Sequence, residues 1–200
     1  MRMRPEIKTE LSRGDLLPLA VYARDRRALR RDMMAIKRLR RVHVGPIATF
    51  YFENYRTMWH QVHEMLLIEK GGESQIDDEL RAYNPLVPKG RELVATVMLE
   101  IEDAELRART LGELGGIETG MFVEIDAMRI AARPETEVER TKADGKTSSV
   151  HFVHFDFTPE LIAKFRTPGA RVTLGIDHPR YRHMAILPEQ TREALAGDFA

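Results

Sequence analysis

The sequence predicts an α+β fold, and three observations favour this class. The chain has 200 residues, of which 43% are hydrophobic and 31% charged, a composition that suits one large or two small folded domains. Its first third contains segments with apolar residues at helical spacing. From Arg91 onward, segments of alternating apolar residues are interrupted by capped helical segments. The chain therefore combines helices with strands, and its two halves differ in pattern.

The N-terminal region, residues 1–85, is predicted to contain a basic helix, a strand pair and further helices. The segment Arg24–Arg41 is amphipathic, because its apolar residues recur on one stripe at about 100° per residue. Gly45-Pro46 marks a turn, and the segment 47–53 after it is rich in β-branched and aromatic residues, which predicts a strand pair broken at this turn. Two helices are expected over 56–69 and 74–82, the second with Ser74 as its N-cap.

The region 90–187 is predicted to be a second structural unit, because two prolines and a glycine precede it. The expected elements are a strand over 93–101, a helix capped by Asp103, strands over 121–132 and 148–157, a helix over 158–166 and a strand over 171–176. A charged hairpin loop over 133–146 connects the second and third strands. This βαββαβ order is that of the ferredoxin-like fold. Within the final segment, 188–200, a short helix can cover a sheet edge.

The net charge of zero hides an uneven distribution. Residues 1–41 hold 13 basic and 5 acidic residues, a balance of +8, and the remaining 18 basic and 26 acidic residues balance this with −8. On the helix over Arg24–Arg41, the side of Arg27, Arg31 and Arg38 lies opposite the apolar stripe. Such a row can bind an acidic or phosphate-bearing partner, nucleic acid included. The alternative is a solvated face that pairs with acidic residues of the same chain.

The composition also excludes several kinds of site. Without cysteine the chain can form no disulfide, thiolate nucleophile, Cys-ligated zinc site or protein-held iron–sulfur cluster. A bound metal ion would need His and carboxylate ligands. The start of the chain lacks an apolar signal segment, and no apolar run approaches the roughly 18 residues of a membrane helix. We therefore expect a cytoplasmic protein that has no membrane segment.

Two groups of residues are candidates for a metal site. On the helix over 56–69, the side chains of His60, His63 and Glu64 can converge on one face, and Glu53 lies just upstream. The second group lies in the C-terminal half, with His151 and His154 on one strand and Asp177 and His178 after the last strand. His151 and His154 are an odd number of residues apart, so they face opposite sides of a sheet. At most one of them can join a given site.

The chain resembles an uncharacterised bacterial domain-of-unknown-function family over about residues 15–185. The resemblance rests on these segments: Val44-Gly45-Pro46, Phe52-Glu53, Gln61-x-x-Glu64-Met65, Tyr83-Asn84-Pro85, Ser148-Ser149-Val150-His151-Phe152 and Asp177-His178-Pro179-x-Tyr181. Genes of this family often lie beside those of rubrerythrin-like proteins and an iron–sulfur oxidoreductase. The resemblance therefore implies that these two kinds of protein are partners. It also directs attention to Glu53, Glu64, His151, Asp177 and His178 rather than to His60 and His63, which lie outside the family pattern.

These observations lead to one functional expectation and two alternatives. The first is an accessory protein of an oxygen or peroxide defence system, with partners of the rubrerythrin-like and iron–sulfur types. Any metal centre of its own would be a His/carboxylate site for Fe, Mn or Zn. The second is a nucleic-acid-binding or regulatory module that uses the basic helix. RNA binding has one further, weaker indication in Phe152-Val153-His154-Phe155, which overlaps the end of the RRM consensus. The third is a metal-dependent enzyme that acts on a small substrate.

Overall fold

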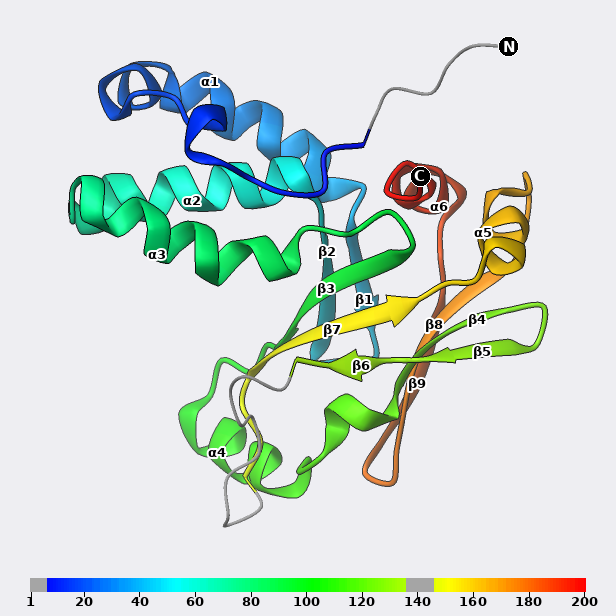
Figure 1. Ribbon diagram of the computed structural model, residues 1–200. Helices are drawn as coiled ribbons and strands as arrows, with labels where there is room; N and C mark the ends of the chain where they lie inside the picture. Colours follow the sequence, from blue (N-terminus) through cyan, green and yellow to red (C-terminus); the bar gives the residue numbers. More distant parts are fainter. Residues whose placement is uncertain (1–6, 136–145) are drawn as a thin grey trace.

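Two antiparallel sheets and six α-helices make up the computed structural model, which describes residues 7–135 and 146–200 (Figure 1). The helices are α1 (Leu19–Arg38), α2 (Tyr55–Glu69), α3 (Glu73–Tyr83), α4 (Ala104–Glu113), α5 (Pro159–Arg166) and α6 (Glu189–Ala196), with 3-10 turns at Arg13–Asp15, Asn84–Leu86 and Ile117–Gly120. The strands are β1 (Arg41–Val44), β2 (Ala48–Glu53), β3 (Glu92–Leu99), β4 (Met121–Ile125), β5 (Met128–Ala131), β6 (Arg133–Pro134), β7 (Val150–Asp156), β8 (Val172–His178) and β9 (Tyr181–Ile186).

Three of the six described helices begin where a side chain caps them. The side chains of Asn54, Asp103 and Thr158 accept hydrogen bonds from the backbone N–H groups of the first turns of α2, α4 and α5. The caps predicted at Asp103 and Thr158 are confirmed. The cap predicted at Ser74 is wrong, because α3 already begins at Glu73 and Ser74 lies in its first turn. There the hydroxyl donates to the Gly71 carbonyl.

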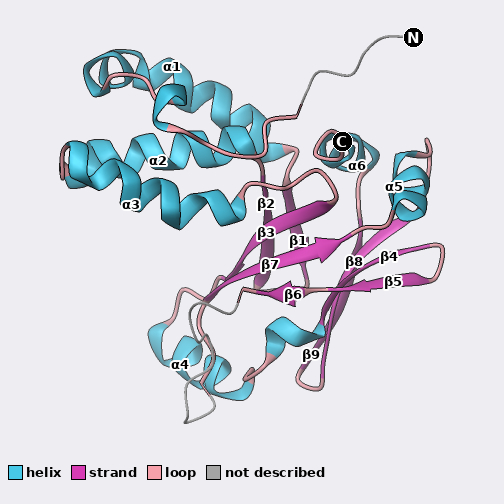
Figure 2. Ribbon diagram, viewed as in Figure 1, coloured by secondary structure: helices cyan, strands magenta, loops and turns pink. Residues whose placement is uncertain are grey.

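The first sheet, which we call sheet A, has the strand order β1-β2-β3-β7-β6, and the second, sheet B, has the order β5-β4-β8-β9 (Figure 2). Strand residues alternate between the two faces of a sheet. In β3, Leu93, Ala95 and Val97 belong to the large core that the two sheets share. Val94, on the opposite face, belongs to a smaller core with residues of α2 and α3. Sheet A therefore lies between sheet B and the N-terminal helices.

The strand pairing differs from the ferredoxin-like arrangement. The predicted neighbours β3 and β7 are paired, but β4 and β8 pair with each other in sheet B. A ferredoxin-like sheet would need β8 beside β3. That edge of β3 is occupied by β2, which comes from the predicted N-terminal region. Strands from both sides of the predicted linker at 83–90 thus lie in one sheet.

Two hairpins were not predicted. The segment 121–132, expected as one strand, turns at Asp126 and Ala127, which both have positive φ angles of 47° and 64°. Positive φ at both central residues is typical of the tight turns that connect antiparallel strands. The second hairpin joins β8 to β9. The expected loop over 133–146 lies mostly outside the described residues, and its first two residues form β6.

The C-terminal segment, which was predicted to cover a sheet edge, is anchored in the large core. After α6, Phe199 is buried in the large core, where its ring contacts those of Phe157 and Phe165. The backbone N–H of Ala200 donates to the Gly90 carbonyl. Asp198 is buried in an ion pair with Arg40, which follows α1.

None of the helices among residues 7–135 and 146–200 has the length and apolar character that a membrane span requires.

Candidate functional site

The five residues predicted to form a metal site lie in different parts of the fold. Glu53 ends β2 on the face of sheet A that the helices cover, and Glu64 faces α1 from α2. His151 lies on the opposite face of sheet A, and Asp177 and His178 end β8 in sheet B. Within the described ranges, no three His, Asp or Glu side chains are arranged to hold a metal ion. The structure therefore does not bring the five residues together into one centre.

Glu64 connects α2 to α1. Its carboxylate accepts two hydrogen bonds from the Arg26 guanidinium, at 2.9 and 2.7 Å, and one from the Tyr22 hydroxyl at 2.8 Å. Because the Tyr22 proton points to Glu64, the hydroxyl oxygen accepts from Nδ1 of His60 at 2.7 Å. The hydrogen bonds from Arg26 lower the pKa of Glu64 to about 2, against the opposing effect of its burial. This is the arrangement of an interhelical ion pair.

His63 is also part of the helix packing. Nδ1 donates to the Trp59 carbonyl at 2.7 Å, and Nε2 accepts from the Leu17 backbone N–H at 3.0 Å, which defines a neutral ring. The ring stacks on Tyr22 with a centroid distance of 4.5 Å. Burial lowers the pKa values of both His60 and His63. In the structure, these two histidines make hydrogen bonds to protein groups.

His151 is buried between sheet A and the segment before β7. Its Nε2 lies 2.9 Å from the Ser148 carbonyl oxygen and 3.2 Å from the Thr147 hydroxyl. Its Nδ1 lies 3.6 Å from a carboxylate oxygen of Glu118, the partner that sequence reasoning did not identify. The motif Ser148-Ser149-Val150-His151 therefore folds back on itself at the start of β7.

The motif around His178 joins the two sheets. Asp177 forms ion pairs with Arg129 and Arg182, and Nε2 of His178 lies 3.2 Å from the Gly115 carbonyl oxygen. Tyr181 reaches the β1–β2 turn, where its hydroxyl donates to the Val44 carbonyl at 2.7 Å. The same oxygen accepts from the backbone N–H groups of Ile47 and Ala48, each at 3.1 Å. These contacts give the motif a structural role.

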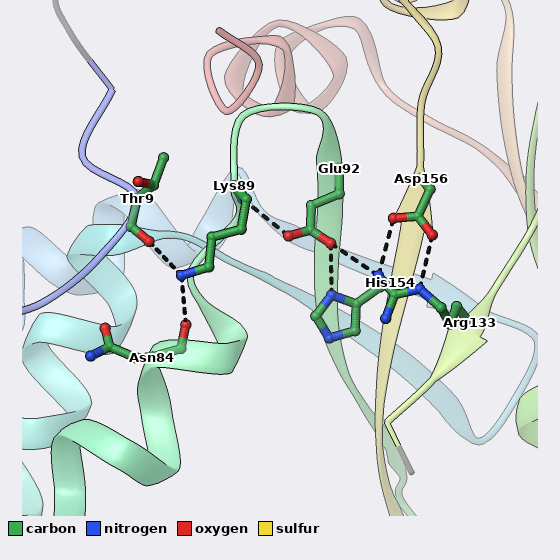
Figure 3. A network of polar contacts seen from close by, with 7 residues as sticks. All are labelled: Thr9, Asn84, Lys89, Glu92, Arg133, His154 and Asp156. Carbon is green, nitrogen blue, oxygen red and sulfur yellow. Dashed lines mark hydrogen bonds and ion pairs between the residues drawn. The ribbon is translucent and has the colours of Figure 1, made fainter. Parts of the chain in front are cut away.

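A second network lies at the start of β3 and was not predicted (Figure 3). Nδ1 of His154 lies 2.8 Å from a carboxylate oxygen of Glu92. The guanidinium of Arg133 donates to the carboxylate of Asp156 and also lies 3.5 Å from Glu92. Beside it, Lys89 donates to the carbonyls of Thr9 and Asn84. Glu92 was missed because its partners come from β6 and β7, which follow it by 41 and 62 residues. The network connects the N-terminal segment to sheet A.

Glu53 borders a sizeable cavity on the helix-covered side of sheet A. Its side chain is 7% exposed, and a carboxylate oxygen accepts a hydrogen bond of 2.8 Å from the Thr96 hydroxyl. The cavity has a volume of about 390 Å³ and lies between sheet A and the helices α2 and α3. Gln61 and Tyr83, which belong to the segments that carry the family resemblance, also line it.

The basic side of α1 lies on the surface. Arg27, Arg31 and Arg38, predicted to bind a partner, are exposed. Arg31 lies 3.8 Å from Asp32, whereas Arg27 and Arg38 form no side-chain hydrogen bond or ion pair with any described residue. The same is true of two neighbours on this side, Arg30 and Lys37. Pairing with the acidic remainder of the chain therefore does not account for these four cations.

Comparisons with known proteins identify the family. A family model described as "Protein of unknown function (DUF3501)" matches residues 10–199. The chain is also similar to the crystal structure of a novel protein of unknown function from Burkholderia pseudomallei K96243, with 38% sequence identity and a TM-score of 0.88. The match covers 95% of this chain and 99% of that one. The comparison with curated proteins found no match. Because the family model spans residues 10–199, the chain belongs to the DUF3501 family.

Proposed function

We propose that this protein is an accessory protein that docks an acidic protein partner through the outward side of α1. We call this side the basic face. It consists of Arg24, Arg27, Arg30, Arg31, Met34, Lys37 and Arg38. At 1.5 Å per residue, the face extends for about 20 Å along the helix. The proposal concerns binding alone and assigns no catalysis to the chain.

One observation carries the proposal: four cations of the basic face have no intramolecular partner among the described residues. Arg27, Arg30, Lys37 and Arg38 are exposed, and no acidic side chain lies within ion-pair distance of them. The two acidic residues of the helix, Asp25 and Asp32, project about 140–160° away from Arg27 at 100° per residue. An acidic surface can therefore approach these four cations without displacing an ion pair that they already make.

Met34 favours a protein partner over nucleic acid. Its side chain is 72% exposed and lies between Arg27 and Arg30 in helical projection. Methionine and arginine are enriched in the centres of protein–protein interfaces, where the apolar side chain is buried. A phosphate backbone offers no comparable apolar contact.

Other features of the chain disfavour nucleic-acid binding. The chain has no net charge, so attraction over a long range is weak. In the segment that overlaps the RRM consensus, Phe155 is buried in the core and Phe152 borders the cavity beneath the helices. These aromatic side chains are not displayed on an open sheet surface, as stacking on bases requires.

The family resemblance suggests which partners to test. Genes of such proteins often lie beside those of rubrerythrin-like proteins and an iron–sulfur oxidoreductase, and these two are the partners we propose. Binding to them would give this cysteine-free chain a role in oxygen or peroxide defence while the partner holds the cofactor.

The test is a binding measurement with each purified neighbour on the full chain and on two double variants. Arg27→Ala/Arg38→Ala removes two cations of the basic face. Arg109→Ala/Arg180→Ala removes the same charge from α4 and from the β8–β9 turn, where both side chains are exposed. We expect the first variant to weaken binding about tenfold or more and the second to have little effect. Binding should also fall as salt is added.

Met34→Ala separates the two kinds of partner. We expect it to weaken binding of the protein partner, because an anchoring side chain is lost, and to leave retention on duplex DNA unchanged. Equal effects of the two arginine variants, or no binding of either neighbour, would contradict the proposal. DNA binding that depends on Arg27 and Arg38 but not on Met34 would support the nucleic-acid alternative instead.

A further inference from the structure

A cavity beside Glu53 has the features of a small-molecule site, and it shares only Lys37 with the basic face. Its floor is the helix-covered side of sheet A, and its walls come from α2, from the ends of α1 and α3 and from the turn that follows α3. Apolar and aromatic side chains make up most of the wall: Tyr51, Met58, Leu86, Met98, Val150 and Phe152. A volume of about 390 Å³ falls within the range of pockets that hold small organic ligands.

The buried carboxylate of Glu53 has few hydrogen-bond donors to offset the free-energy cost of removing it from water. Its one hydrogen bond among the described residues comes from Thr96, a neutral donor. An ionised carboxylate in an apolar surrounding is costly unless an opposite charge or several donors accompany it. Glu53 is therefore the group in this cavity that most requires a positively charged partner.

Arg40 lines the same cavity but does not supply that partner. Its guanidinium donates to the main-chain carbonyls of Phe52 and Glu53. Its charge is paired with the carboxylate of Asp198, which is also buried. The arginine is thus fully engaged by backbone oxygens and by the C-terminal segment, and the side chain of Glu53 remains available to a ligand.

The other polar groups in the cavity extend the acceptor character of the site. The amide of Gln61 donates to the Tyr83 hydroxyl at 3.3 Å. No described residue donates to the amide oxygen of Gln61, so this oxygen can accept a hydrogen bond from a ligand. Lys37 borders the cavity as an exposed cation and also belongs to the basic face.

A metal ion fits these groups less well than an organic cation. Glu53 is the only acidic side chain among the described residues that line the cavity, and no histidine lines it. Divalent ions in proteins require several oxygen or nitrogen ligands. A cation with an apolar body would instead use both the carboxylate and the apolar wall.

We infer that this cavity binds a small aromatic amine or amidine, with its cationic group against Glu53 and Gln61 and its ring against Phe152, Met98 and Leu86. The hydroxyl of Thr96 holds the carboxylate in place from the floor of the cavity. The ring would lie in the apolar part of the site. This ligand class follows from the charge of Glu53 and from the wall, and it does not depend on the proposed partner.

The experiment measures binding of tryptamine by calorimetry at neutral pH, with indole-3-propionate as a comparison. The two probes share the indole ring and differ in the charge of the side chain. We expect tryptamine to bind about tenfold tighter or more, because a carboxylate would be repelled by Glu53. Preference for indole-3-propionate, or no tryptamine binding at millimolar concentration, would overturn the inference.

Three variants assign the binding to this cavity. Glu53→Gln should weaken tryptamine binding about tenfold and leave the two probes nearly equal, while the melting temperature of the free protein stays the same or rises. Glu79→Gln is the matched control, because Glu79 is a buried glutamate on α3 that accepts a hydrogen bond from Gln75 outside the cavity. It should leave tryptamine binding unchanged, and equal losses in both variants would contradict the site.

Met98→Trp tests the site without altering Glu53. Met98 is 37% exposed at the edge of the cavity, so a larger side chain can fill the cavity from the outside. We expect it to abolish tryptamine binding and to leave docking through the basic face unaffected. Tryptamine binding at wild-type strength in a folded Met98→Trp protein would show that the probe binds elsewhere.

Discussion

The hydroxyl of Tyr181 lies 2.7 Å from the carbonyl oxygen of Val44 and joins the β8–β9 hairpin of sheet B to the β1–β2 hairpin of sheet A. These two residues are 137 positions apart in the chain. The contact relates two segments of the family pattern, Val44-Gly45-Pro46 and Asp177-His178-Pro179-x-Tyr181. Both segments therefore stabilise the relative position of the two sheets.

Replacing Tyr181 with Phe should destabilise the protein by about 1–3 kcal/mol, because it leaves a buried carbonyl and two backbone N–H groups without their partner. Urea unfolding measures this change. Tyr51→Phe is the control, since its hydroxyl binds Glu100 in a more exposed position. A similar loss of stability in both variants would contradict the structural role of Tyr181.

Gly45→Ala should lower the free energy of unfolding further than Tyr181→Phe does. Gly45 has a φ angle of 72°, and an added Cβ atom would lie 2.5 Å from the His183 ring and 2.6 Å from the Tyr181 hydroxyl. Both the strained backbone and the collision act against the folded state. Gly72→Ala is a matched control, because Gly72 has a φ angle of 73° and open space around it. The melting temperatures of the two variants are compared by thermal unfolding. The loss in Gly72→Ala reports the backbone strain alone, and the additional loss in Gly45→Ala reports the collision.

The ion pair between Arg26 and Glu64 predicts how stability changes in acid. The folded-state pKa of Glu64 is about 2, below its ordinary value of 4.5. The unfolded chain therefore binds the proton more readily, and this contribution to stability is present above pH 4.5 and is lost as the pH falls towards 2. The pair is partly exposed, so we expect its contribution to be about 1 kcal/mol.

Glu64→Gln tests this pH dependence. The variant should be less stable than the wild type at neutral pH, and the two stabilities should approach each other between pH 4.5 and 2. Urea unfolding at a series of pH values provides the measurement. A constant difference across this range would mean that the carboxylate of Glu64 is not responsible.

Asp198→Ala should destabilise the protein by about 3–5 kcal/mol, because Arg40 would then be buried without its counter-ion. The exposed pair of Arg81 and Asp78 is the control, and Asp78→Ala should change stability by less than about 1 kcal/mol. Urea unfolding measures the free energy of unfolding of the two single variants. The double variant Arg40→Met/Asp198→Leu should recover part of the lost stability, since no charge is left buried.

The local elements could be predicted from sequence because their signals are local. Asp103 and Thr158 cap the helices where their residue types indicate, and the apolar stripe of α1 includes the buried residues Tyr22 and Met33. The turn at Asp126-Ala127 has no glycine, so the sequence contains no strong signal for the hairpin. The pairing of β2 with β3 depends on contacts across the predicted linker, which no local pattern encodes.

The candidate sites show the same limit. Helical periodicity identified the basic face, because exposure of Arg27, Arg31 and Arg38 follows from the position of the apolar stripe. The partners of Glu64 and His151 could not be identified this way, since Arg26 and Glu118 lie on other elements. Glu53 was proposed as a metal ligand. Its position beside Gln61 and Thr96, which defines the cavity, depends on the packing of α2 over sheet A.

The buried pair of Arg40 and Asp198 also has a consequence for synthesis on the ribosome. The two residues are 158 positions apart, so α1 and the β1–β2 hairpin emerge long before the carboxylate that neutralises Arg40. Until Asp198 is made, burial of Arg40 against sheet A is unfavourable. We expect the N-terminal half to remain incompletely packed on the nascent chain and to close only when the last helix and the residues after it are released.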